Sequence, residues 1–438
     1  MEQEEIKRKL FGLWEKTTHT SKELISNLFE YYFDINYLEY KELDGKILCA
    51  LCGIPYTFGF GEKKLRGLYI LSLSSEEGFR KKGNLSELLN KFNHKFEKEF
   101  DFTFLRPQTE LLADYFGTQG YFSSFYILEE RFTPLHVFKN DYLLSLTESD
   151  ERIKELKIHL LEEITVTDNE SFKLFPEETI IDFIKEIEAK SSSAINLNHT
   201  DKDLEYILQE NTIRHLFHYI SYDTEGKITG VAFIHKEEIK RIRVVAFYVT
   251  DSCSYYALLD HIKNEYSDYS ISVNTSDPKY QIHSIIQQTY ASANPNGGDL
   301  DNTFSTVEIP YNTNKLLQPL GMIKILRFDR ILHFLAETRS DVDFKLHIRD
   351  LNTDEKENDS GEFSDKEKTE TENKTVFKIR NGKCIIEKYD NFSHNPSILN
   401  LTKKEVTELL LRKNDSSNLI MEAFGIPRMN FQMRLLPC

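Results

Sequence analysis

A short run of positive charge stands immediately before a helical pattern in this sequence. Arg80, Lys81 and Lys82 are followed by Gly83, and apolar residues recur at helical spacing from Asn84 onward. The first backbone N–H groups of a helix have no acceptor within the helix, and the helix dipole favours negative charge there. A glycine lets a ligand approach the backbone closely. A strand, this turn and a helix form an arrangement suited to a phosphate-bearing ligand, although the four residues alone are more typical of a solvated basic turn.

The neighbouring sequence places this basic turn between a strand and a helix. The preceding "LRGLYILSLS" is apolar enough for a central strand, and the following helix is predicted to reach about Phe100. Its apolar face comprises Leu85, Leu88, Leu89, Phe92 and Phe96. The turn has no G-K-[ST] of a Walker loop, and it lacks two glycines of the dinucleotide fingerprint.

The elements on either side predict an α/β sheet with a mixed edge. Apolar residues from Phe11 to Phe33 recur at helical spacing, and two strands surround Asp44-Gly45, a pair suited to a hairpin turn. After the basic turn come a strand "FDFTFL", a short helix over 108–118 and a strand "YFSSFYILEERF". Helices and strands in this alternation are typical of the α/β class.

The order of elements partly recurs from 148 to 328. "DTEGKITGVAFIHKEEIKRIRVVAFYVT" repeats the acidic-Gly turn, the strand, the charged turn and the central strand, but "DSCSYYALLDHI" replaces "FRKKGN". From 329 the pattern changes to antiparallel strands and a helix, "TKKEVTELLLRK". The charged segment 352–374 is almost devoid of apolar residues and predicts a disordered loop. We therefore predict three units: 1–147, 148–328 and 329–438.

Composition limits the classes of partner and the cellular compartment. The chain has 438 residues and a formal net charge of −16, which argues against nucleic acid or an anionic membrane as the main partner and is compatible with a cationic substrate. The 5 cysteines are odd in number and scattered, and Cys49 and Cys52 lie in an apolar run, so we predict buried thiols and no metal site. The charged N-terminus and the lack of a long apolar run predict a cytoplasmic protein.

The basic turn resembles the pyrophosphate loop of the GNAT superfamily of N-acetyltransferases, whose pattern is R/Q-x-x-G-x-G/A between a central strand and a helix. Arg80, Gly83 and Leu85 occupy the three signature positions, and Leu85 departs from the usual small residue. The enhanced intracellular survival (Eis) acetyltransferases carry a basic triplet, a glycine and a bulky aliphatic residue at this place. The resemblance continues in "LFGLWEKTT", "IPYTFGFG" and "LADYFGTQGYFSSFY".

The resemblance to Eis proteins implies a fold, a co-substrate and partners. The implied fold is α/β: tandem GNAT domains with central mixed sheets, the second of them degenerate, followed by a sterol-carrier-protein-like α+β domain. The implied co-substrate is acetyl-CoA, the acceptor is a primary amine of a small molecule, and a homo-oligomer is the implied assembly. The implied cofactor-binding residues are Leu71, Ser72, Leu73, Arg80, Lys81, Lys82, Gly83, Asn84, Leu85 and Ser86.

The catalytic residues that the resemblance implies include one departure. The family's usual acid is a tyrosine four residues before the glycine of the short helix, here Gly120, and Phe116 stands at that position. Tyr115 is adjacent, but on a helix it points about 100° away. In Eis-type enzymes the C-terminal carboxylate reaches the acetyl-transfer cleft, which implies a role for Cys438 in the apolar tail "MNFQMRLLPC". The catalytic candidates are therefore Tyr115, Phe116 and Cys438.

Three functions remain open from the sequence. The first is an active N-acetyltransferase in which Tyr115 or water protonates the departing thiolate. The second is a CoA-binding protein with little or no turnover, because Phe116 replaces the usual acid. The third is a lipid-binding protein that acts through its C-terminal unit.

Overall fold

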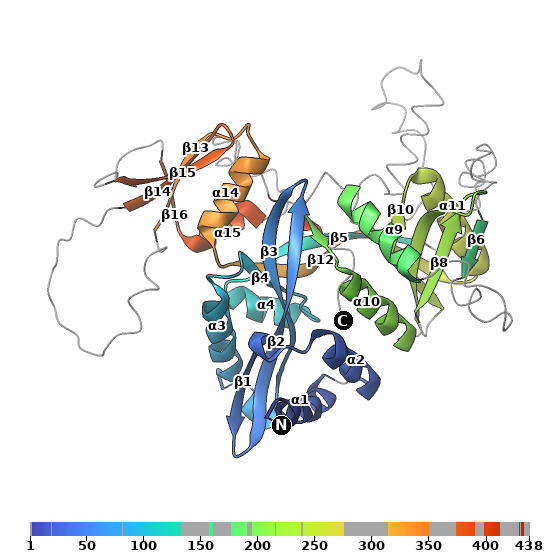
Figure 1. Cartoon of the computed structure of the whole chain (residues 1–438), viewed down its shortest axis with the longest axis horizontal. Coiled ribbons are helices and arrows are strands. Elements are labelled where there is room, and N and C mark those ends of the chain that lie inside the picture. Colours follow the sequence, from blue (N-terminus) through green and yellow to red (C-terminus); the bar gives the residue numbers. More distant parts are fainter. Residues whose placement is uncertain are drawn as a thin grey trace.

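The structure is a computed structural model of the chain. The structure describes residues 2–18, 20–80, 82–132, 157–160, 177–190, 195–214, 216–237, 240–275, 314–349, 374–389, 398–411, 429 and 431–432. Within these ranges, helices pack against a large twisted sheet, and a smaller sheet stands beside it (Figure 1). The predicted mixed α/β class is confirmed.

The first part of the chain contains the strand, basic turn and helix predicted from the sequence. Its elements are α1 (Glu2–Thr17), α2 (Lys22–Tyr32), η1 (Ile35–Tyr37), β1 (Leu38–Leu43), β2 (Lys46–Phe60), β3 (Lys63–Ser75), η2 (Glu77–Phe79), α3 (Asn84–Phe96), β4 (Phe102–Leu105), α4 (Glu110–Thr118) and β5 (Phe122–Phe132). The Asp44-Gly45 hairpin is confirmed, with φ of 50° and 74° at these residues. The single helical segment from Phe11 to Phe33 is wrong: it is two helices, because the Ser21 side chain caps α2 by accepting the backbone N–H of Leu24 at 3.3 Å.

The remaining elements belong to two further stretches. The middle stretch contains β6 (Lys157–Leu160), α9 (Glu177–Lys190), β7 (Ile195–Asn198), α10 (Asp201–Ile213), β8 (Phe217–Tyr222), β9 (Ile228–Glu237), β10 (Arg241–Val249), α11 (Ser252–Glu265) and β11 (Ser270–Thr275). The last contains β12 (Asn314–Ile325), α14 (Phe328–Thr338), β13 (Phe344–Ile348), β14 (Lys374–Arg380), β15 (Lys383–Tyr389), β16 (Ile398–Leu401), α15 (Lys403–Leu411) and β17 (Phe431–Gln432). Most of the predicted acidic loop, residues 352–373, lies outside the described ranges.

One sheet runs through both repeats. Among the described residues it has 13 strands, in the order β12-β4-β3-β2-β7-β17-β5-β11-β10-β9-β8-β6, with β1 added beside β2. Because β12 also pairs with β5, the strands from β12 through β2 to β5 close into a ring. The second repeat has the pairings of the first: β9 and β10 are antiparallel and β10 and β11 parallel, as β2 and β3 are antiparallel and β3 and β4 parallel.

Hydrogen bonding crosses the predicted unit boundaries. β12 was assigned to the second unit, yet it pairs with β4 and β5 of the first. β7 likewise joins β2, and β17 lies between β7 and β5. The boundaries near 147 and 328 stay predictions; strands of the first two units share the large sheet, and of the described strands after 328 only β17 joins it.

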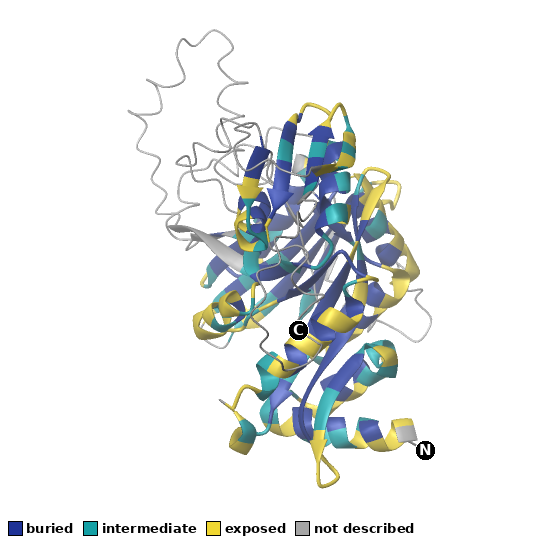
Figure 2. Cartoon of the chain, turned by 90° about the vertical axis from the view of Figure 1, so that its left-hand side faces the viewer, coloured by how far each residue is buried: buried dark blue, intermediate teal, exposed yellow. Residues whose placement is uncertain are grey.

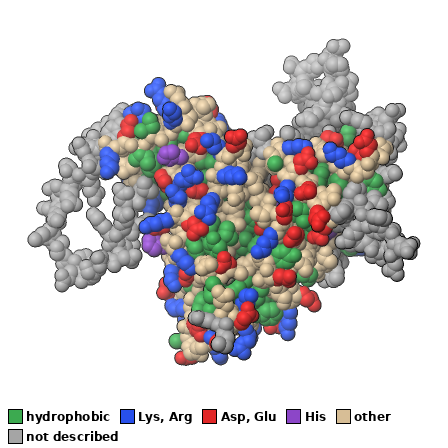
Figure 3. Space-filling view, in the orientation of Figure 1, with side chains coloured by type: hydrophobic (Ala, Val, Ile, Leu, Met, Phe, Trp, Pro, Cys, Tyr) green, Lys and Arg blue, Asp and Glu red, His purple; other side chains and the backbone are tan. Residues whose placement is uncertain are grey.

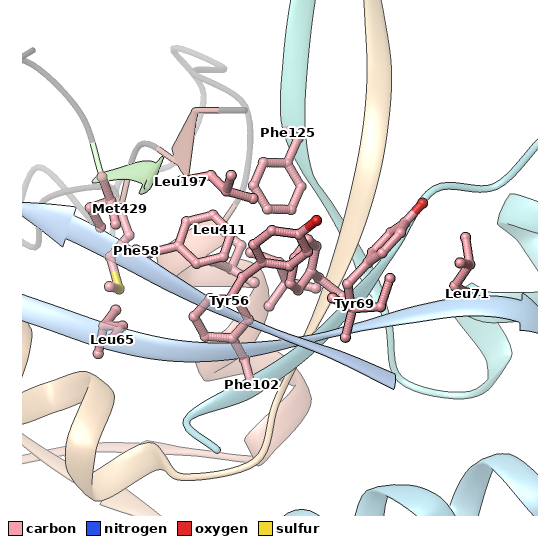
Figure 4. Packing of buried hydrophobic residues seen from close by; sticks show 14 of the residues in the cluster. Tyr56, Phe58, Leu65, Tyr69, Leu71, Phe102, Phe125, Leu197, Leu411 and Met429 are labelled. Atoms are coloured by element: carbon pink, nitrogen blue, oxygen red, sulfur yellow. The ribbon is translucent and has the colours of Figure 1, made fainter. Parts of the chain in front are cut away.

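The strands of the large sheet are mostly buried, whereas the helices expose their outer faces (Figure 2). Aromatic side chains fill the ring of strands from within, and Figure 4 shows several of them. They include Phe58, Phe102, Phe104 and Phe125, each no more than 1% exposed. Phe104 lies 5.2 Å from Phe58 and 5.7 Å from Phe125 between ring centroids, so the interior of the ring is packed with aromatic side chains.

The smaller sheet has the order β15-β14-β13-β16, in which β13 and β16 are parallel. α14 packs between this sheet and β3, where Lys63 pairs with Glu337 at 3.0 Å. In the described part of the chain, no helix is both long and apolar enough to cross a bilayer. Cys49 and Cys52 are buried on β2 as predicted, and burial raises the pKa of the Cys52 thiol to about 12.

Candidate active site

A cavity of about 1160 Å³ opens where β3 and β4 part. Within the described strands these two parallel strands pair from Gly67–Phe102 to Tyr69–Phe104. Beyond that point β3 continues to Ser75 along one side of the cavity, and the chain after β4 lines the other side. Where the strands have parted, backbone N–H and C=O groups that would otherwise pair within the sheet face the cavity. A ligand can therefore form hydrogen bonds with them.

A bulge interrupts β3 along this cavity. Cys52 pairs with Leu71, but Ala50 pairs with Ser74, so β3 holds one residue more than β2 in this interval. Ser72 takes the left-handed conformation with φ of 53°, and the Ser74 hydroxyl donates to the Ser72 carbonyl at 2.8 Å. A bulge leaves a residue out of the ladder, and left-handed non-glycine residues cost about 1–3 kcal/mol and cluster at functional sites. Leu71, Ser72 and Leu73 all line the cavity.

The N-terminus of α3 faces the same cavity. Gly83 is its cap residue, with φ of 78° and no side-chain hydrogen bond to the helix. A Cβ at Gly83 would meet nothing within 4 Å, so the left-handed backbone, rather than lack of space, favours glycine here. Asn84, Leu85 and Ser86 follow as the first turn, and all three line the cavity. The cap has no side chain, so it leaves the first N–H groups of α3 to a ligand.

Positive charge lies on both sides of the cavity. Arg80 lines it and donates from Nε to the Ser75 carbonyl at 3.3 Å, which holds the arginine against the end of β3. Lys82 places Nζ 5.1 Å from the ring centroid of Phe79, another lining residue. Arg106 lies on the opposite wall, after β4. This arrangement suits a phosphate-bearing ligand.

Tyr115 and Phe116 both line the cavity from α4. The Tyr115 hydroxyl lies 3.0 Å from Ser86 Oγ, in the first turn of α3. Phe116 is 6% exposed and packs 5.9 Å from the Tyr121 ring. The 100° between neighbouring helical residues therefore does not take Tyr115 out of the cavity, and at this pair of positions Tyr115 supplies the hydroxyl.

The structure adds lining residues that sequence reasoning missed. Tyr69 lies at the apex where β3 and β4 part, and Arg106 lies on the far wall. Thr17, the last residue of α1, and Thr18, which follows it, line another part of the cavity. The alternation of side chains along a strand places Tyr69 on the same face as Leu71, so the sequence could have predicted Tyr69 as a lining residue. No sequence pattern indicated the two threonines, because the helix was predicted to continue past them.

Two predicted residues, Lys81 and Cys438, lie outside the described residues.

Solved structures of N-acyltransferases are similar to this chain. A probable N-acyltransferase from Enterococcus faecalis has a TM-score of 0.61 at 15% identity, over 95% of this chain and 90% of its own. A GCN5-related N-acetyltransferase from Anabaena variabilis has a TM-score of 0.61 at 13% identity, over 97% and 96%. Eis1 from Mycobacterium abscessus has a TM-score of 0.55 at 10% identity, over 92% and 89%. The fold is that of a GCN5-related N-acetyltransferase.

The GNAT, Eis-like fold that the resemblance implied is thereby confirmed, whereas the sterol-carrier-protein-like identity of the last unit stays a prediction. The coverage extends over most of this chain and most of each relative, so the likeness is not confined to one domain. No protein-family model matches the chain, and no curated protein matches it either. At such low identities a shared GNAT fold does not by itself establish an activity.

Proposed function

We propose that the chain is an N-acyltransferase that moves an acetyl group from acetyl-CoA to a primary amine of a small, cationic molecule. One observation carries the proposal: the cavity between β3 and β4 meets the basic, glycine-capped N-terminus of α3. A long ligand with an anionic group at one end and a neutral arm fits both parts of this arrangement.

The charged and neutral parts of acetyl-CoA decide how it lies in the cavity. Its diphosphate binds the backbone N–H groups from Gly83 to Ser86, with Arg80 and Lys82 supplying positive charge. Its pantetheine arm runs along the bulged half of β3, where amide groups of the arm bond to strand backbone. A strand rises about 3.3 Å per residue, so β3 from Tyr69 to Ser75 spans roughly 20 Å, enough for an extended arm. The thioester then lies beside Leu71.

The reaction is direct acyl transfer. The amine nitrogen attacks the thioester carbonyl carbon, the C–S bond breaks, the nitrogen loses a proton and the sulfur leaves as a thiolate. We assign protonation of the thiolate to the Tyr115 hydroxyl, since Phe116 has no proton to give. A free thiol has a pKa of about 8.5, so the thiolate is a tolerable leaving group even where proton transfer is incomplete.

The acceptor enters beside α1. Thr17 and Thr18 line the cavity there, whereas α3, whose N-terminus binds the diphosphate, and α4 line the donor part. The formal net charge of −16 favours a cationic acceptor over an anionic one. On the face in Figure 3 acidic and basic side chains are interspersed. The resemblance to Eis-type enzymes alone carries the further proposal that the carboxylate of Cys438 helps to remove the proton of the amine.

Two measurements test this function. Titration calorimetry with CoA and acetyl-CoA should show binding, and failure of both to bind would contradict the proposal. A screen of polyamines, aminoglycosides and peptide N-termini, followed by release of free CoA thiol, should then identify an acceptor.

A second candidate is a CoA-binding protein without turnover, and Phe116 at the position of the usual acid favours it. Tight CoA binding with no thiol release for any amine would support that candidate. The lipid-binding alternative stays a prediction that a lipid-retention assay addresses.

A further inference from the structure

We infer that the ring of Tyr69 forms the inner wall of the acyl pocket and restricts the donor to short acyl groups. The inference rests on the proposed function, because it concerns the acyl end of the bound CoA thioester. It names a residue that determines specificity, and the class of donor that follows from it.

Tyr69 lies where the cavity ends along β3. The arm of the donor runs from Ser75 toward Leu71, and the next side chain on that face of β3 is Tyr69. Tyr69 pairs with Phe104 in the last register pair before the strands part. An acyl group that extends beyond the thioester along this strand therefore meets the Tyr69 ring. Figure 4 shows Leu71 and Tyr69 near one another along β3.

The wall is rigid because aromatic rings pack behind it. The Tyr69 ring lies 5.1 Å from that of Phe104 and 6.4 Å from that of Tyr56, and Tyr56 and Phe104 lie 6.1 Å apart. Tyr69 is 3% exposed, Tyr56 4% and Phe104 0%. Phe104 in turn contacts Phe58 and Phe125 inside the ring of strands. Close-packed interiors do not yield to an added methylene without strain, so the wall cannot recede.

The remaining walls near the apex are also apolar and buried. Leu71 is 7% exposed, Leu105 3% and Phe116 6%, and all three line the cavity. A pocket with such walls accepts a methyl group and selects by size rather than by polarity. One misfitting methylene in a hydrophobic pocket is worth about 10- to 200-fold in discrimination. An acyl chain several carbons longer than acetyl should therefore bind poorly.

The test measures binding and needs no acceptor. Titration calorimetry on the full chain measures the Kd of CoA, acetyl-CoA, butyryl-CoA and octanoyl-CoA. Each ligand is titrated into the wild type, Tyr69→Ala and Tyr69→Phe. In the wild type the Kd of octanoyl-CoA should exceed that of acetyl-CoA by at least about tenfold. Tyr69→Ala removes the ring and should bring the ratio to about one, whereas Tyr69→Phe keeps the ring and should keep the wild-type ratio.

Each outcome decides between the ring and another determinant. A wild-type ratio near one would overturn the inference, and so would an unchanged ratio in a folded Tyr69→Ala variant. Loss of the ratio in Tyr69→Phe would move the effect from the ring to the hydroxyl and would also overturn it. If Tyr69→Ala does not fold, Tyr69→Leu replaces it, with a smaller fall in the ratio expected. Failure of the wild type to bind CoA at all would contradict the proposed function instead.

Discussion

The two repeats build the same strand–turn–helix unit, and the unit differs in what lies between strand and helix. In the first repeat β3 parts from β4 after three register pairs, and the cavity that opens there reaches the N-terminus of α3. In the second, β10 pairs with β11 from Arg241 to Val244 and then continues to Val249 beside α11. There Phe247 of β10 and Tyr255 of α11 pack with ring centroids 4.7 Å apart. Among the described residues, the same backbone plan thus borders a cavity in the first repeat, and aromatic rings pack beside the helix in the second.

The helix caps differ in the same sense. Gly83 leaves the first turn of α3 without a side-chain cap, whereas the Asp251 carboxylate caps α11 and accepts the N–H of Ser254 at 2.9 Å. An aspartate at a helix N-terminus both occupies an N–H group and repels a phosphate. The fold therefore has two helix N-termini at which an anion could bind. The cap residue and the neighbouring side chains decide which of the two is accessible.

Gly83→Glu should weaken CoA binding in the first repeat, and this is the largest effect that we expect. The glutamate places negative charge where the diphosphate binds, and loss of two charge-assisted hydrogen bonds of about 1.5–3 kcal/mol each weakens CoA binding about a thousandfold. Calorimetry measures this change in Kd. The matched control is Gly226→Glu, since Gly226 also has positive φ, 81°, and open space around its Cβ position. Equal losses in both variants would attribute the effect to backbone strain and contradict a diphosphate site at Gly83.

Tyr115→Phe should lower kcat about a hundredfold, the ordinary size of an acid-catalysis effect. The substitution removes the hydroxyl that lies 3.0 Å from Ser86 Oγ and keeps the ring. The rate of CoA thiol release with saturating donor and acceptor measures kcat, and the Kd of acetyl-CoA is measured for the same variant. Ser86→Ala is the control, because it removes the hydroxyl contact without removing the proposed acid. If Tyr115→Phe retains the wild-type kcat, proton transfer from Tyr115 is not part of the rate-limiting step.

Phe116→Tyr should raise kcat, by less than the ~10²-fold of ordinary acid catalysis, if protonation of the thiolate limits turnover, because it places a hydroxyl at the position of the family's usual acid. Phe116 already lines the cavity, so the added hydroxyl can face it. Steady-state rates compare this variant with the wild type and with Phe116→Leu. An unchanged kcat would show that protonation does not limit turnover, and loss of CoA binding would show that the ring packs against the donor.

Asp251→Ala should have the smallest effect and should leave CoA binding at one site per chain. Loss of the cap costs α11 about 1 kcal/mol in the free energy of unfolding, which denaturant titration measures. The packed rings of Phe247 and Tyr255 still fill the space beside α11, so no second site opens. A stoichiometry of two CoA per chain, in the wild type or the variant, would contradict the proposed difference between the repeats.

Much of the donor part of the candidate site could be predicted because it is local in sequence. The strand, the basic turn, Gly83 and the periodic helix lie within 63–96, and each follows from short-range rules: alternation, a left-handed glycine and an apolar helical face. The repeat could be predicted for the same reason, since its charged turns and central strand recur in order. The replacement of "FRKKGN" by "DSCSYY" already distinguished the two helix N-termini.

The tertiary structure decided what the local rules cannot express. β12 enters the first repeat's sheet beside β4 and β5, although it follows them far along the chain: Asn314 pairs with Arg131 of β5, and Met322 pairs with Leu105 of β4. Tyr69 and Arg106 became lining residues because β3 and β4 pair and then part. Strand pairing and side-chain packing depend on partners distant in sequence, and no alternation or periodicity within one segment records which partner it will meet.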